Sequence, residues 1–120
     1  MRKVRIRERI EEMADHCDVE VALVVLGGKW KLLILKYLLT GPRRFGELRR
    51  AMPGITQRML TRQLRELEDD GLVERTVFAE SPPRTQYALT GTGDSLSTLI
   101  GDLDKWGRWY RERLENSAES

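Results

Sequence analysis

The middle of the chain carries a row of arginines at helical spacing, within the segment ITQRMLTRQLREL. Arg58, Arg62 and Arg65 follow one another at intervals of four and three residues, which places them on one face of an α-helix. Because no acidic side chain relieves that face before the last turn, these charges repel one another unless an anionic group faces them. Arginine suits such a partner because its planar guanidinium donates two parallel hydrogen bonds to a phosphate or a guanine edge. The pattern favours a nucleic-acid ligand over an ordinary solvated helix face.

The distribution of charge along the chain indicates the same kind of partner. The 120 residues carry a formal net charge of only +2. Residues 43–65, however, hold seven arginines and no lysine against the single acid Glu47, whereas residues 91–120 hold six acidic and four basic side chains. A basic middle beside an acidic end is typical of a protein with one anion-facing surface.

His16 and Cys17 are the one histidine and the one cysteine of the chain. Adjacent helical residues point in different directions, and no further histidine or cysteine could complete a zinc site. A catalytic dyad would also need an orienting group and an oxyanion site, and the sequence contains no such constellation. We therefore expect no enzyme activity, no metal and no cofactor. A lone cysteine fits a reducing, cytoplasmic location, and no apolar run approaches the ~20 residues that span a membrane.

Apolar periodicity predicts the helices that position these residues. The segment GGKWKLLILKYLL is apolar almost all the way round, so a helix over 29–39 must be covered on more than one side and should form the centre of the domain. Gly27 and Gly28 turn the chain into it from a preceding helix capped by Asp18, and Thr56 caps the arginine-bearing helix. The predicted helices span residues 2–15, 18–26, 29–39, 43–52 (starting at Pro42), 57–70 and 91–116.

A β-hairpin is predicted after the arginine-bearing helix. The β-branched and aromatic segments LVERTVFAE and TQYALT flank the turn SPPR, residues 81–84, so the tip carries Arg84. Helix, short turn, helix and hairpin is the order of a winged helix-turn-helix. The expected fold class is therefore mainly α with a small β-hairpin (α+β). We expect a single domain over residues 1–120, with 117–120 as a tail.

The predicted binding surface for double-stranded DNA centres on the recognition helix, about 56–70, whose early side chains would reach base edges in the major groove. Its later turns, rich in acidic residues, are expected to point away from DNA. Arginines before this helix would lie near the phosphate backbone, and Arg84 would reach a minor groove. The candidate DNA-contacting residues are Thr56, Gln57, Arg58, Thr61, Arg62, Arg65, Arg43, Arg44, Arg49, Arg50 and Arg84. The alternative is a winged-helix module whose arginine face meets an acidic protein.

The predicted C-terminal helix has a longer apolar stripe than one terminal helix of a small domain needs. Its members are Leu96, Leu99, Ile100, Leu103, Trp106, Tyr110 and Leu114, of which the first six are the candidate dimer-interface residues. A second copy of the chain is the expected cover, which makes the protein a homodimer. Trp30 and Trp106 are interpreted as packing residues, and a small-molecule cleft lined by tryptophans between the dimer helices stays open as an alternative.

The segments CDVEVALVVLGGKWKLLILKYLL, RFGELRRAMPGITQRMLTRQLRELEDDGLVERTVF and PPRTQYALTGTG resemble the HxlR-type family of bacterial transcriptional regulators. The resemblance covers roughly residues 17–107, with 1–16 and 91–116 as dimerisation elements. It implies a homodimeric winged helix-turn-helix that binds pseudo-palindromic DNA, with the recognition helix on TQRMLTRQLREL. Asp18 departs from the family pattern, in which a proline commonly follows the cysteine.

The resemblance also makes Cys17 a candidate sensor. Members of the family usually have a cysteine there, and several use it to sense oxidants or reactive electrophiles. A thiol near a helix N-terminus is more reactive because the helix stabilises its thiolate, and two Cys17 residues could pair across a dimer. The alternative is a small residue that fills a gap, with a different small-molecule effector or none.

Overall fold

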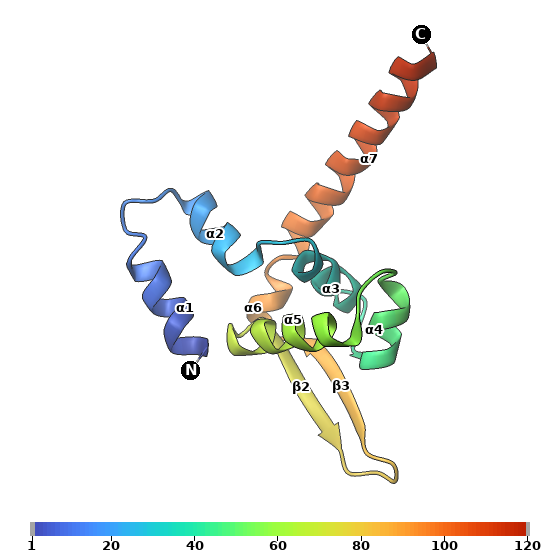
Figure 1. Ribbon diagram of the computed structural model, residues 1–120. Coiled ribbons are helices and arrows are strands. Elements are labelled where there is room, and N and C mark those ends of the chain that lie inside the picture. The colour runs from blue at the N-terminus through green and yellow to red at the C-terminus, as the bar shows by residue number, and fades with distance from the viewer. Residues whose placement is uncertain (1, 120) are drawn as a thin grey trace.

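The computed structural model describes the backbone of residues 2–119 and the side chains of residues 6–117. Seven helices and three strands follow one another along this part of the chain (Figure 1). They are α1 (Arg2–Glu11), α2 (Asp18–Leu26), α3 (Trp30–Leu38), β1 (Arg43–Arg44), α4 (Phe45–Ala51), α5 (Gln57–Asp69), β2 (Val73–Phe78), β3 (Arg84–Leu89), α6 (Gly91–Asp94) and α7 (Ser97–Glu119). The order confirms the predicted winged helix-turn-helix. Among the described residues, no helix combines the length and apolar character needed to cross a bilayer.

Helix α3 is the centre of the core, as its all-round apolar character predicts. Ile34, Leu35 and Leu38 are buried on it, and α4, α5, β3 and α7 all pack against it. A helix covered on several sides cannot carry a long wet face, which explains why its polar residues are few.

Residues close together in the sequence determine both the turn between α4 and α5 and the packing of α5 on the core. Gly54 adopts a φ of 93°, which glycine tolerates because it has no Cβ. The Thr56 hydroxyl then accepts a hydrogen bond from the Met59 amide at 3.1 Å and caps α5. Three leucines one helical turn apart, Leu60, Leu64 and Leu67, are fully buried under α5. The predicted cap and buried stripe are therefore confirmed.

The wing is an antiparallel sheet of three strands in the order β1-β3-β2, one strand more than predicted. Residues 43 and 44 do not begin a helix after Pro42; they pair with β3, so that Arg43 lies opposite Tyr87. The Glu47 carboxylate accepts the Arg44 amide at 2.8 Å, which caps α4 and starts it at Phe45. The prediction of a helix from residue 43 was therefore wrong by two residues.

The predicted helix over 91–116 is interrupted. Helix α6 ends at Asp94 and α7 begins at Ser97. Thr90 fixes this corner, because its hydroxyl accepts the Gly93 amide at 3.1 Å and donates to the Gly71 carbonyl at 2.6 Å. Gly93 lies so close to the Leu72 carbonyl that a Cβ there would overlap it. Helix α7 extends away from the wing (Figure 1) and continues through residues 117–119, which we expected to form a tail.

The N-terminal helices also differ in detail from the prediction. Helix α1 ends at Glu11 rather than near residue 15, and α2 has Cys17, not Asp18, as its N-cap. Asp18 instead lies with Glu20 in the first turn, where carboxylates interact favourably with the helix dipole. Met1 and Ser120 of the expected domain lie outside the described residues.

Candidate nucleic-acid interface

The outward face of α5 presents the predicted arginines to solvent. Arg58, Arg62 and Arg65 are exposed, and together with Gln57 and Thr61 they line a groove along the helix. The groove also contains Glu66 and Asp69 at its C-terminal end. The leucine stripe on the opposite face holds α5 against α3, so the arginine side chains are displayed on a rigid support.

A buried ion pair, which the sequence analysis missed, fixes α5 to α3. The ammonium of Lys31, with a side chain only 8% exposed, lies 2.8 Å from Glu66 Oε1. The other carboxylate oxygen of Glu66 lies 3.5 Å from Arg62 Nε, while the Arg62 side chain stays 78% exposed. Glu66 thus orients Arg62 without removing its guanidinium from solvent. The sequence signal for this pair was a lysine within the apolar face of the central helix.

We expect Lys31→Met to lower the free energy of unfolding by about 1–3 kcal/mol, because it leaves the partly buried Glu66 carboxylate without its ammonium. Urea unfolding followed by circular dichroism at one protein concentration measures this change. Lys36→Met is the matched control on the same helix, since the exposed Lys36 ammonium lies 3.8 Å from Asp104 and such pairs contribute little. Equal losses in both variants would contradict a structural role for the buried pair.

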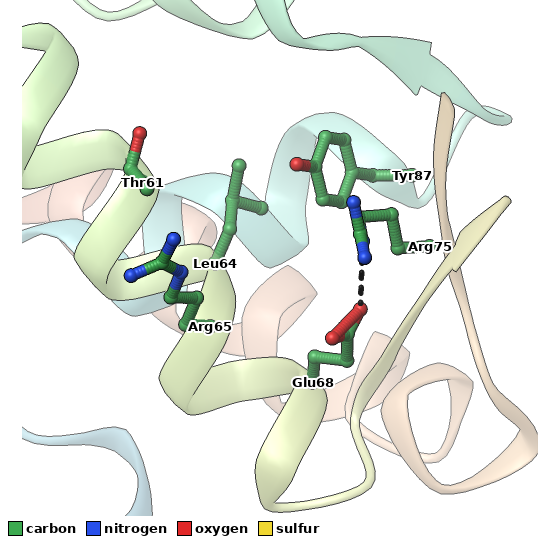
Figure 2. Close-up of a pocket in the computed structure, with 6 residues that line it drawn as sticks. All are labelled: Thr61, Leu64, Arg65, Glu68, Arg75 and Tyr87. Carbon is green, nitrogen blue, oxygen red and sulfur yellow. Dashed lines mark ion pairs between the residues drawn. The ribbon is translucent and has the colours of Figure 1, made fainter. Parts of the chain in front are cut away.

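A pocket of about 230 Å³ lies between α5 and the wing (Figure 2). Thr61, Leu64, Arg65 and Glu68 line it from α5, and Arg75 and Tyr87 line it from β2 and β3. Arg75 lies opposite Tyr87 in the strand register, and its Nε lies 3.6 Å from Glu68 Oε2. Burial raises the pKa of Tyr87 above its ordinary value of 10.0, and nearby Arg75 partly offsets this. Arg75 and Tyr87 were not predicted, because their place depends on the pairing of two strands.

The remaining predicted arginines differ in how far they are exposed to solvent. Arg44, Arg49 and Arg50 are exposed, whereas Arg43 is half-buried and donates to the Thr40 hydroxyl at 2.7 Å. Arg84 is held on the wing: its guanidinium lies 4.3 Å from the centre of the Phe78 ring and 3.4 Å from Glu80 Oε1. The Arg84 side chain is therefore packed against the wing and does not extend from its tip.

Residues 25–115 match the model of a family described as HxlR-like helix-turn-helix. The chain belongs to this family. A relative from Methanothermobacter thermautotrophicus, named as an uncharacterized helix-turn-helix-type transcriptional regulator, is 52% identical to this chain over 112 residues. The aligned part is 91% of this chain and 86% of the relative. These matches identify the chain as a transcriptional regulator with a helix-turn-helix DNA-binding fold.

Two solved structures are similar to the HxlR-like protein along most of its length. The redox regulator HypR in its reduced form has a TM-score of 0.78 and 46% identity, and covers 83% of this chain and 99% of its own. The reduced form of the transcriptional regulator YodB from Bacillus subtilis has a TM-score of 0.66 and 38% identity, covering 74% and 87%.

Cys17 of the HxlR-like protein is exposed at the start of α2. Its thiol donates to Glu20 Oε1 at 3.5 Å, and His16 Nε2 lies 3.7 Å from Glu20 Oε2. Within the described part of the chain, no cluster of three or more histidine, cysteine, aspartate or glutamate side chains is arranged to hold a metal ion.

The apolar stripe of α7 divides into a buried and an exposed part. Ile100 is only 6% exposed, and Leu96, which directly precedes α7, packs on the same core, so these two predicted interface residues already have partners within their own chain. Leu99, Leu103, Trp106 and Tyr110 are exposed. The Trp106 ring stacks on Tyr110 with centroids 5.2 Å apart, while Trp30 packs partly buried against the core.

Proposed function

We propose that the protein is a homodimeric, sequence-specific DNA-binding regulator that inserts α5 into the major groove of a pseudo-palindromic operator. The exposed arginine face of α5, held by the buried leucine stripe and the Lys31–Glu66 pair, carries this proposal. Gln57, Arg58, Thr61 and Arg62 are the proposed base readers, because arginine pairs with guanine and glutamine with adenine. Thr56 and the first amides of α5 would bind a phosphate.

The other arginines and the terminal helices have supporting roles in this proposal. Arg43, Arg44, Arg49, Arg50 and Arg65 contact the phosphate backbone, and Arg84 leaves Phe78 to enter the minor groove. The exposed part of the α7 stripe, together with α1, forms the dimer contact. Two-fold symmetry then sets the half-sites one helical turn apart, about 34–36 Å. An inducer acts by changing the spacing of the two α5 helices.

Selection from a pool of random DNA duplexes at about 0.15 M salt tests this function and yields an operator for the later experiments. The expected result is enrichment of two-fold symmetric sequences. Gel-shift titrations of the selected operator should show a steep salt dependence, with a slope of about −0.9 per phosphate contact. An absence of enrichment would favour the rival function, a winged-helix module whose arginine face binds an acidic protein.

We propose in addition that Cys17 regulates DNA binding by oxidation. Its exposure at the start of α2 and the similarity to HypR, which is named as a redox regulator, support this. Diamide would accept two electrons and two protons from two Cys17 thiols, leaving a disulfide between protomers.

Diamide is expected to change operator affinity severalfold in the wild-type protein and to leave Cys17→Ser unchanged. A non-reducing gel should show a covalent dimer in the wild-type protein alone. Unchanged operator binding after complete oxidation would exclude Cys17 from the control of DNA binding.

A further inference from the structure

The pocket between α5 and the wing has the composition of an oxyanion site. Three structural elements bring together two guanidinium groups, Arg65 and Arg75, and two hydroxyls, Thr61 and Tyr87 (Figure 2). The Glu68 carboxylate is the one acidic side chain in the lining, and Arg75 lies against it at 3.6 Å. The lining therefore carries a net charge of +1, two arginines against one glutamate.

The hydrogen-bonding capacity of the lining also matches an anion. A guanidinium has five N–H donors, so an ion pair with Glu68 leaves Arg75 able to donate to a second acceptor. A tyrosine with the ordinary pKa of 10.0 is protonated at neutral pH, and burial raises the pKa of Tyr87 further, so its hydroxyl can donate. In Figure 2 this hydroxyl points from β3 toward α5.

The size and position of the pocket select among anions. At about 230 Å³ it is smaller than the ~300–1,000 Å³ of pockets that enclose drug-sized molecules. Thr61 and Arg65 line both this pocket and the groove on the outward face of α5, so the two lie next to each other. When α5 occupies a major groove and the wing an adjacent minor groove, the phosphodiester strand that separates the grooves must pass between α5 and the wing.

We propose that Arg65, Arg75 and Tyr87 bind a backbone phosphate of the operator between its major and minor grooves. This inference rests on the proposed DNA-binding function and adds two wing residues, Arg75 and Tyr87, to the interface. The phosphate would lock the wing to the recognition helix, because its oxygens receive donors from α5, β2 and β3 at once.

Arg75→Gln and Tyr87→Phe test the site in the full-length protein. Arg75→Gln should weaken binding about tenfold, equally on the selected operator and on a scrambled duplex, and should reduce the salt slope by about 0.9. Tyr87→Phe removes one neutral donor and should weaken binding about threefold with the salt slope unchanged. Arg108→Gln on α7 is the matched control and should bind like the wild-type protein. Circular dichroism and melting curves verify that each variant is folded.

A series of operators, each with one backbone phosphate replaced by a neutral methylphosphonate, locates the phosphate that the pocket binds. One position per half-site should weaken wild-type binding but cause no further loss in Arg75→Gln. The pocket assignment is overturned if the wild-type protein binds the operator and both variants bind it with the same affinity as the wild-type protein. It is likewise overturned if inorganic phosphate binds the free wild-type protein, Arg75→Gln abolishes that binding, and operator affinity is unchanged. If the wild-type protein binds no DNA at all, the proposed function itself fails with the pocket.

Discussion

The Arg62→Ala variant is expected to bind the selected operator roughly 5- to 150-fold more weakly than the wild-type protein, which is the effect of about 1–3 kcal/mol for one base-reading pair. The Arg62 side chain is 78% exposed in the groove along α5, and Glu66 Oε2 orients its guanidinium from 3.5 Å. Competition binding with operators changed at single positions measures affinity and base preference together. One base pair in each half-site should lose its preference.

Arg108→Ala provides a matched control for this variant. Arg108 is also exposed and also paired with an acid four residues away, with its Nη2 2.8 Å from Asp104 Oδ2, but it lies on α7. We expect its operator affinity to equal that of the wild-type protein. An equal loss of Arg62→Ala binding on every DNA sequence would instead make Arg62 a phosphate contact, and no loss would remove it from the interface.

Trp106→Glu is expected to convert the dimer to a monomer and to reduce operator affinity about 10²-fold or more. Trp106 is 60% exposed in the middle of the apolar stripe of α7, and a buried, unpaired carboxylate would destabilise the contact with a second copy. In a dimer, binding at one half-site holds the second α5 at a high effective concentration near the other half-site. A monomer loses this advantage. Light scattering after size exclusion measures the mass, and gel shifts measure the affinity.

Lys105→Glu is the control for the dimer prediction. At 100° per residue, Lys105 lies about 130° from the centre of the stripe formed by Leu99, Leu103, Trp106 and Tyr110, and therefore outside it. It should therefore remain a dimer with wild-type affinity. A Trp106→Glu protein that stays dimeric would contradict the assignment of the α7 stripe, and the dimer contact would then lie elsewhere.

Local patterns in the sequence predicted the elements whose formation depends on near neighbours. The Thr56 cap, the leucine stripe of α5 and its arginine face all follow from spacings of three and four residues within one helix. The central place of α3 followed from its all-round apolar character. These features define most of the candidate site, because they fix both the recognition helix and its orientation on the core.

Features that depend on distant partners could not be predicted in this way. Strand β1 has only two residues and exists because β3, more than 40 positions later, offers an edge. The corner at the start of α6 depends on the hydrogen bond from the Thr90 hydroxyl to the distant Gly71 carbonyl. The Lys31–Glu66 pair likewise joins two helices that only the folded chain brings together. In each case the tertiary contact overrides the local preference.

Chemical-shift mapping of the isotope-labelled protein during titration with the selected operator tests directly whether α5 reads the DNA. We expect the largest changes at the backbone amides of residues 56–65 and at the Nε–H groups of Arg58 and Arg62, with smaller changes in β2 and β3 and little change along the exposed length of α7. Saturating DNA that left residues 56–65 unchanged while shifting resonances of other elements would contradict α5 as the DNA-reading helix.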